Sequence, residues 1–283
     1  MTDGQIWIYS LLDTLASFVR MIINTKFKRV ARIKKRHSRC LILGNGPSLI
    51  DSLEKNKDHL SELDLIAVNL MVNSPEYEKY KPKTYVVCDP LFWVEDVPES
   101  LRERIDLFYD NIVQKTQWEL QLYIPFLARK NKKIESILSQ NPHIKICYYN
   151  KTKVEGHKWL CYAAYNRQWG MPRAQNVIVA ALMMAIHSKY KEIYLAGVDS
   201  NFIHNIWVDE KNNLRFDDYH YYSDSEEKIK RILPEKIHEE CLLSYYMFKS
   251  YVDIENYSIY KNIKICNTGP HSFIDAFEKK EII

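Results

Sequence analysis

The sequence predicts an α/β protein with a Rossmann-like, doubly wound, mostly parallel sheet and helices on both faces. From Cys40 onward, short apolar runs alternate with helical stretches. The runs are continuously apolar rather than alternating, which is typical of strands covered on both faces. Of the seven glycines, four stand at or just past expected strand ends: Gly44, Gly46, Gly197 and Gly269.

The individual elements follow from these runs. Strands are expected at 40–44, 63–69, 84–89, 144–150, 192–199 and 263–267. Helices are expected at 48–60, 101–140 (interrupted at Pro125), 174–187, 225–258 (as one or two helices) and 271–280. The polar and aromatic stretch 200–225 is too long for a tight connection and is expected to form a small lid over the site.

The chain is expected to divide into an N-terminal segment, 1–38, and a catalytic α/β domain, 39–283. Residues 5–24 predict an amphipathic helix, interrupted by Asp13 and Arg20, with no cleavage site of a secretory signal. Eight Lys or Arg residues and no acid follow between Lys26 and Arg39. This combination predicts a cytoplasmic protein that is peripheral to the anionic inner membrane. The alternatives are an inserted anchor, or a helix that packs on the core or on a dimer partner.

Composition excludes some functions. The formal net charge of the 283 residues is only +4, so no global field indicates nucleic acid. The six cysteines show no zinc-like spacing, and Cys40, Cys88, Cys147 and Cys266 lie in apolar runs. They are expected to be free, buried thiols in a reducing cytosol.

The stretch Gly44-Asn45-Gly46-Pro47-Ser48 joins a strand to a helix. Glycine there lets the backbone approach a ligand, and the helix start offers N–H groups to a phosphate. The alternative is a tight turn without a ligand. The third glycine of the dinucleotide fingerprint is missing and Asn69 replaces the acid that would close the second strand, which disfavours NAD.

Further polar residues stand where ligands bind in such sheets, beyond the carboxyl ends of strands. Asn69 and Asp89 end two strands, and Arg173, Gln175 and Asn176 begin a helix as a candidate anion site. Each could instead cap a turn or helix. In the expected lid, His220 could act as a base and Tyr221 and Tyr222 could bind a leaving phosphate. Asp217-Asp218 could bind a divalent metal or form a solvated turn.

Several motifs together resemble the bacterial lipooligosaccharide sialyltransferases of glycosyltransferase family 42. They are LILGNGPSL (41–49), DLIAVN (64–69), VVCDPLFW (86–93), YKEIYLAGVD (190–199) and ICNTGPHS (265–272). Related motifs occur in other bacterial surface-polysaccharide proteins, some of which share their core with pterin diphosphokinases. The resemblance covers roughly residues 39–280.

The resemblance implies a donor site lined by Asn45, Asn69, Asp89, the helix start 173–176, and Ser272 near the phosphate or base. It implies tyrosines that support the departing phosphate, a role that falls to Tyr221 or Tyr222. The family's base is a histidine just beyond a His-Tyr pair. Here His220-Tyr221 matches the pair and Asp224 takes the position of the base, so either His220 or Asp224 would remove the proton.

The implied reaction is an inverting, metal-independent transfer of a sialic-acid-like nonulosonic acid from its CMP-activated donor to a hydroxyl of a glycan or lipid-linked glycan. No cofactor is expected, and a homo-oligomer is implied by the resemblance alone. Two alternatives remain: an ATP-using enzyme similar to pterin diphosphokinases, and a non-catalytic protein that binds a nucleotide or glycan.

Overall fold

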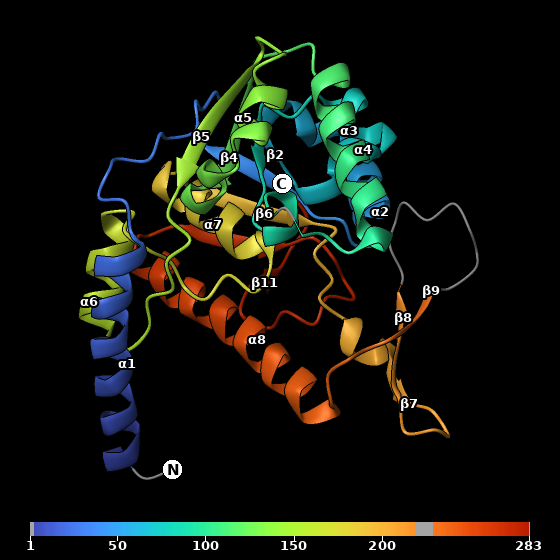
Figure 1. Ribbon diagram of the computed structural model, residues 1–283. Helices are drawn as coiled ribbons and strands as arrows, with labels where there is room; N and C mark the ends of the chain where they lie inside the picture. Colours follow the sequence, from blue (N-terminus) through green and yellow to red (C-terminus); the bar gives the residue numbers. More distant parts are fainter. Residues whose placement is uncertain (1–2, 95, 219–228, 283) are drawn as a thin grey trace.

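A computed structural model describes residues 3–94, 96–218 and 229–282 (Figure 1). Its centre is an eight-stranded sheet in the order β11-β10-β6-β1-β2-β3-β4-β5, and all seven strand pairs are parallel. The strands are β1 (Arg39–Leu43), β2 (Asp64–Val68), β3 (Thr84–Val86), β4 (Leu120–Pro125), β5 (Ile144–Tyr149), β6 (Glu192–Ala196), β10 (Lys264–Asn267) and β11 (Glu278–Lys279). This confirms the predicted fold class.

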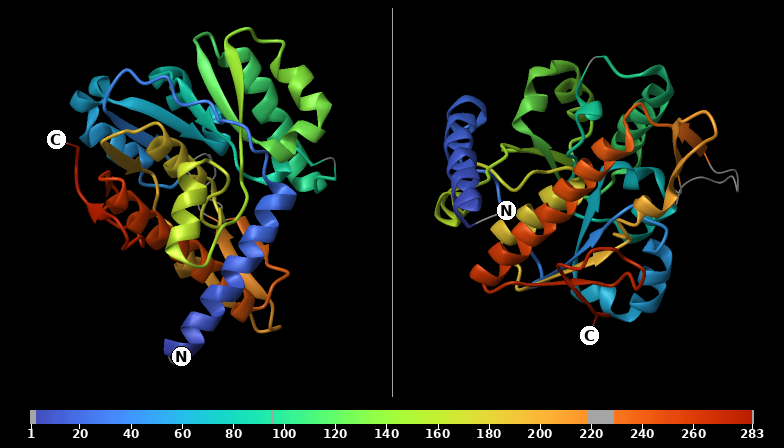
Figure 2. Two further views of the ribbon diagram at one scale, coloured as in Figure 1. Left: turned by 90° about the vertical axis from the view of Figure 1, so that its left-hand side faces the viewer. Right: turned by 90° about the horizontal axis from the view of Figure 1, so that it is seen from below.

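Helices cover both faces of the sheet (Figure 2). The described helices are α1 (Asp3–Asn24), α2 (Leu49–Lys55), α3 (Pro75–Tyr80), α4 (Glu99–Lys115), α5 (Lys132–Leu138), α6 (Lys158–Asn166), α7 (Val177–His187) and α8 (Ile237–Tyr260). Successive residues of β1 show why the apolar runs are continuous. Cys40 and Ile42 belong to the core that includes α7 and α8, whereas Leu41 and Leu43 belong to the core that includes α2, α4 and α5. Each strand therefore needs apolar side chains on both of its faces.

The predicted lid region, 200–225, contributes two of the three strands of a second, smaller sheet. A short 3-10 helix, η5 (Phe202–Asn205), precedes the antiparallel strands β7 (Ile206–Val208), β8 (Leu214–Asp218) and β9 (Ile229–Ile232). The prediction of a helix from residue 225 onward was wrong at its beginning, because residues 229–232 pair with β8 and α8 begins at Ile237.

Two other ranges predicted to be helical contain strands. The range 101–140 is mostly helical, as predicted, through α4, the 3-10 helix η4 (Phe126–Lys130) and α5, but it also contains β4, a fully buried strand between β3 and β5. Pro125 ends that strand rather than breaking a helix. The range 271–280 forms turns and then β11, which pairs with β10. The buried Ser272 hydroxyl accepts a hydrogen bond from the Ile274 amide (3.2 Å) and so stabilises a turn where a helix was expected.

The basic segment after α1 is fastened to the body of the protein. The amide of Lys34 donates to Gln121 Oε1 on β4 (2.6 Å), and the amide of Arg36 donates to Asp64 Oδ2 on β2 (2.9 Å). Val30 and Ile33 are buried in the same core as α7. The backbone of this segment is therefore held at the amino-terminal end of the sheet, while its Lys and Arg side chains are mostly exposed.

The cysteines match the expectation from the sequence. Cys40, Cys147 and Cys266 lie on strands, Cys88 lies just after β3, and all four are buried free thiols. Burial raises the pKa of the Cys40 thiol well above its usual value, which keeps the thiol neutral.

Candidate functional site

The candidate site lies at the point in the sheet where the order of successive strands reverses. β1 pairs with β2 on one side and with β6 on the other, so the connections after β1 and β6 leave toward different halves of the sheet. In open α/β sheets this switch point forms the crevice that binds ligands. A cavity of about 440 Å³ opens there, a volume within the range of small-molecule sites.

Several elements contribute to the cavity. Its lining comes from the loops after β1, β2 and β6, the start of α7, η5, β8 and α8. The lining residues are Gly44, Asn45, Gly46, Pro47, Val68, Asn69, Asn176, Val177, Ile178, Gly197, Val198, Asp199, Ser200, Asn201, Phe202, Asn205, Phe216 and Tyr251.

The glycines after β1 permit a close approach to the loop after β6. The amide of Gly44 donates to Ala196 O (2.7 Å), and the amide of Gly46 donates to Gly197 O (2.8 Å). A Cβ atom on Gly44 would lie 2.3 Å from Gly197 O, which leaves no room for any other residue. Gly197 itself has a φ of +64°, which favours glycine. The loops after β1 and β6 therefore hold each other in a fixed position, a contact that we call the lock.

Asp199 completes this lock, and the sequence analysis did not select it. Its carboxylate is buried and accepts hydrogen bonds from the backbone amide of Ser48 (3.1 Å) and from the Ser48 hydroxyl (2.5 Å). The amide of Leu49 donates to Gly46 O (3.1 Å). The amides expected to face a phosphate are thus used within the protein. In the sequence, Asp199 could have been selected as a site residue because it is the acidic residue that ends the apolar run 192–199.

Asn45 and Asn69 each have a buried side-chain oxygen that accepts no hydrogen bond from the described residues. Asn45 Nδ2 donates a long hydrogen bond to Val68 O (3.4 Å). Asn45 Oδ1 and Asn69 Oδ1 are both buried, and neither has a partner among the described residues. Asn69 has a φ of +44°, and its carbonyl accepts a hydrogen bond from the Tyr85 hydroxyl (2.5 Å). A buried acceptor without a partner costs about 1–3 kcal/mol, so a ligand that donates to both oxygens would recover that free energy.

The predicted helix start divides into separate roles. Asn176 lines the cavity as the N-cap of α7: its Oδ1 accepts from the amides of Ile178 (3.1 Å) and Val179 (3.3 Å). Its Nδ2 donates to the hydroxyl of Tyr251 on α8 (2.8 Å). The capping alternative therefore describes this side chain, and its amide groups are occupied.

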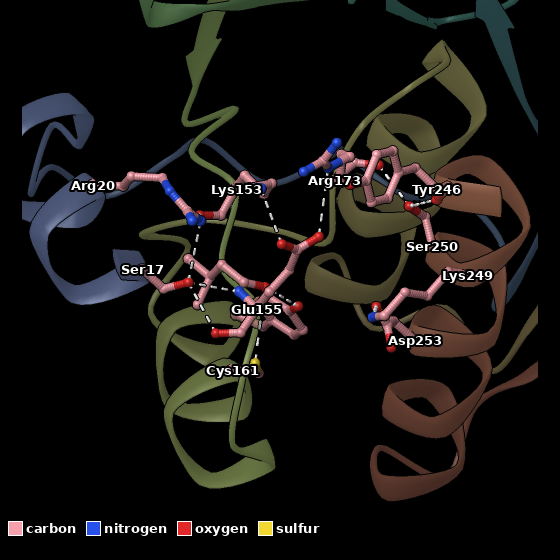
Figure 3. Close-up of polar contacts among 12 residues, drawn as sticks. Ser17, Arg20, Lys153, Glu155, Cys161, Arg173, Tyr246, Lys249, Ser250 and Asp253 are labelled. Carbon is pink, nitrogen blue, oxygen red and sulfur yellow. Dashed lines mark hydrogen bonds and ion pairs between the residues drawn. The ribbon is translucent and has the colours of Figure 1, made fainter. Parts of the chain in front are cut away.

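Arg173 and Gln175 do not line the cavity. The Arg173 guanidinium lies over the Tyr246 ring, 3.5 Å from its centroid, and Arg173 Nε lies 3.5 Å from Glu155 Oε1 (Figure 3). Gln175 is exposed. The anion site expected at 173–176 is therefore not assembled at the cavity.

Asp89 and Ser272 also lie outside the cavity lining. Asp89 Oδ1 accepts from the amide of Leu91 (3.0 Å) and caps the 3-10 helix η3 (Pro90–Phe92). The buried Ser272 hydroxyl donates to Val198 O (2.8 Å) and accepts from Asn267 Nδ2 (2.9 Å). Ser272 thereby supports the loop that carries Asp199.

The predicted catalytic residues His220, Tyr221, Tyr222 and Asp224 lie outside the described residues. The strands on either side, β8 and β9, belong to the small sheet, and Phe216 of β8 lines the cavity. Phe202 and Tyr251 supply further aromatic surface that the sequence analysis did not select. Within 3–94, 96–218 and 229–282, no group of three or more His, Cys, Asp or Glu residues could hold a metal ion.

At the level of sequence, no protein-family model and no curated protein matches this chain. Among solved structures, the chain is similar to the MAf glycosyltransferase from Magnetospirillum magneticum AMB-1, at 11% identity and a TM-score of 0.49. That match covers 93% of this chain and 37% of the other, so this chain spans little more than a third of that protein.

The chain is also similar to CstII from Campylobacter jejuni, a sialyltransferase solved with the substrate analogue CMP-3FNeuAc. The identity is 16%, the TM-score 0.41, and 86% of each chain is covered. A CstII structure with a trisaccharide acceptor and CMP matches with the same values. Sialyltransferases, which the sequence motifs resemble, are thus among the solved structures to which this chain is similar. TM-scores below 0.5 leave the function to be argued from the site.

Proposed function

We propose that the protein is a glycosyltransferase that moves a sialic-acid-like nonulosonic acid from a CMP-activated donor to a hydroxyl of a surface glycan. The observation that carries the proposal is that two residues lining the cavity at the switch point, Asn45 and Asn69, each have a buried side-chain oxygen, Oδ1, without a hydrogen-bond partner among the described residues. Both need hydrogen-bond donors, and a nucleoside offers them from its base and its ribose.

The chemistry of the site favours cytidine over uridine. The exocyclic amine of cytosine is a donor, whereas the corresponding group of uracil is a carbonyl and only accepts. A carboxamide oxygen that faces this position of the base discriminates between cytosine and uracil. It accepts a hydrogen bond from the cytosine amine, but it would remain without a partner opposite the uracil carbonyl. Phe202 and Phe216 add apolar surface for the base or the sugar.

The proposed reaction requires a side chain that removes the proton of the acceptor hydroxyl. In the proposed displacement, the acceptor hydroxyl oxygen bonds to the anomeric carbon, the bond to the CMP phosphate oxygen breaks, and the hydroxyl proton passes to a base. His220 or Asp224 is that base, and Tyr221 or Tyr222 donates to the departing phosphate. The proximity of β8, which leads directly into these residues, to the cavity supports this assignment.

Single substitutions at the two candidate bases test the proposal in a transfer assay with a CMP-activated nonulosonic acid. We expect His220→Ala to reduce kcat by about 10²–10⁴-fold while the affinity for CMP stays unchanged. Asp224→Asn is the competing variant, and His238→Ala, at an exposed position of α8, is the matched control. Full transfer by both the His220 and the Asp224 variants would contradict the assignment of the base. Absence of transfer by the unmodified protein would contradict the donor class.

A further inference from the structure

Helix α1 packs on the protein through its polar side, which is the reverse of the usual arrangement. Thr14 and Ser17 are buried, Ser17 completely. The Ser17 hydroxyl donates to Glu155 O (2.9 Å) and accepts from the Glu155 amide (2.9 Å). Thr14 Oγ1 accepts from the amide of His157 (2.8 Å). These hydrogen bonds join α1 to the loop that precedes α6, and Figure 3 shows those between Ser17 and Glu155.

This polar contact is close and specific. Gly156 lies against the helix, and a Cβ atom there would be 2.3 Å from Thr14 Oγ1. Arg20 extends along the same loop, where its Nη1 donates to the Ser17 hydroxyl (3.3 Å) and to Lys153 O (3.4 Å). Polar groups therefore supply most of the contact, with Met21 as a buried apolar residue beside them, and the other large apolar residues of α1 are turned away from the core.

The outward side of α1 is a continuous apolar surface. At about 100° per residue, its apolar positions cover roughly half of the circumference, and the charged Asp13 and Arg20 stand together beyond one edge. We call this surface the apolar face; it consists of Trp7, Ile8, Tyr9, Leu12, Leu15, Phe18, Val19, Ile22 and Ile23, each between 53% and 71% exposed. The helix lies at the periphery beside α6 (Figures 1 and 2).

A basic groove lies beyond the carboxyl end of α1. Its volume is about 490 Å³, and its lining includes no acidic residue. We define the basic groove by its six cationic side chains: Lys28, Arg29, Arg32, Arg167, Lys189 and Lys261. Within the part of the chain that the structure describes, none of the six is in an ion pair.

Phe27 connects the two surfaces. It is 56% exposed, lines the basic groove, and packs edge-to-face on Trp169 with ring centroids 5.1 Å apart. Inside the groove, the buried His187 Nδ1 has no hydrogen-bond partner among the described residues. An apolar face, an aromatic residue and a cluster of uncompensated cations thus follow one another along one side of the protein.

We infer that the apolar face and the basic groove together form a docking surface for an anionic phospholipid membrane, with lipid phosphates in the groove and the apolar side chains among the acyl chains. An amphipathic helix with adjacent Lys and Arg binds such surfaces by burial and by charge together. A second copy of this chain fits less well, because it would present the same uncompensated cations. The inference is independent of the donor site, since it uses no residue of that cavity.

Vesicle co-sedimentation of the full chain tests the inference. We expect binding to vesicles of phosphatidylcholine with phosphatidylglycerol and little binding to phosphatidylcholine alone. The triple variant Lys28→Gln, Arg29→Gln, Lys261→Gln should bind on the order of 100-fold more weakly. The control variant Lys55→Gln, Lys57→Gln, Lys130→Gln removes the same charge from exposed positions elsewhere and should bind within about 3-fold of the unmodified protein.

A second variant and two further measurements identify the occupant of each surface. Leu12→Ser, Val19→Ser, Ile22→Ser should abolish vesicle binding while the thermal unfolding temperature is retained, because all three side chains are exposed. Inorganic phosphate should compete no better than sodium chloride of equal ionic strength. Equal binding of the two triple charge variants would overturn the inference. Groove-dependent binding of phosphate without vesicle binding would also overturn it. A third contradictory result would be that the unmodified protein is a dimer, does not bind vesicles, and becomes a monomer in the apolar-face variant.

Discussion

The carboxylate of Asp199 accepts two hydrogen bonds from one residue, Ser48, through its backbone amide (3.1 Å) and its hydroxyl (2.5 Å). Ser48 follows the glycine loop after β1, and Asp199 follows β6. The two central strands of the sheet are therefore joined at their carboxyl ends by a buried, charge-assisted contact. This contact holds the glycine loop, which carries the cavity-lining Asn45, against the loop after β6.

The contact predicts energetic coupling between the two residues. Asp199→Asn and Ser48→Ala should each lower the free energy of unfolding by about 1–3 kcal/mol, because each leaves a buried polar group without its partner. The double variant should cost less than the sum of the two, with a coupling energy of about 1–2 kcal/mol. Denaturant unfolding of the four proteins measures this quantity. Strict additivity would show that the two side chains do not support one another.

The structure of the glycine loop predicts that alanine substitutions at two nearby glycines differ in their cost to stability. A Cβ atom on Gly46 would lie 2.4 Å from Asp199 Oδ2, whereas a Cβ atom on Gly269 would meet nothing nearer than 3.2 Å. Gly46→Ala should therefore cost about 1–3 kcal/mol or more and abolish nucleotide binding, while Gly269→Ala should cost less, because its neighbours need to shift by only a few tenths of an ångström. Thermal unfolding with and without nucleotide measures both effects. Equal behaviour of the two variants would show that the lock is not needed.

Much of the sheet could be predicted because its strands carry their own signal. The run CLIL is apolar at every position, since Cys40 and Ile42 face one core while Leu41 and Leu43 face the other. A helix of comparable length would need only one apolar side. Local sequence therefore sufficed for β1 and for β6.

The elements that were missed depend on partners distant in sequence. Gln121 interrupts the apolar run of β4, and its amide is satisfied by Arg32 O (3.2 Å) and by the amide of Lys34 (2.6 Å). Nothing within the 101–140 range shows that these partners exist. The strand β11 likewise exists only because β10 lies beside it.

The candidate site shows the same limit. The sequence indicated Asn45 and Asn69, and the cavity brings them together. It also indicated Arg173, whose neighbours Glu155 and Tyr246 come from other parts of the chain and hold it away from the cavity. The structural role of Asp199 depends on Ser48, about 150 residues earlier in the chain. Spacing alone does not reveal such a pair.

His187 predicts a pH dependence of stability. Burial lowers its pKa from 6.5 to about 4, while its Nε2–H donates to Tyr165 O (2.8 Å). As the pH falls below 6.5, the unfolded chain binds the proton first, so the free energy of unfolding falls between pH 6.5 and pH 4. This residue should account for a loss of about 2 kcal/mol between pH 7.5 and pH 5.

Replacement of the imidazole isolates this contribution. His187→Gln should remove that share of the pH dependence, whereas His238→Gln, at an exposed position, should retain it. Denaturant unfolding of the three proteins at pH 7.5 and pH 5 provides the comparison. An identical loss of stability in the unmodified protein and the His187 variant would contradict the assignment.

The central claim is that the cavity at Asn45 and Asn69 binds a cytidine nucleotide, and the most direct test is a thermal-shift comparison of the unmodified protein with Asn45→Ala. The ligands are CMP, CDP, UDP, GDP, ATP and NAD, each with and without Mg²⁺, and Asn256→Ala on α8 is the control variant. We expect CMP without metal to stabilise the unmodified protein and the control by about 2.7 kcal/mol at 100 times its Kd, and Asn45→Ala to lose most of that shift. A response to UDP, GDP, ATP or NAD instead, or an undiminished CMP shift in Asn45→Ala, would contradict the account.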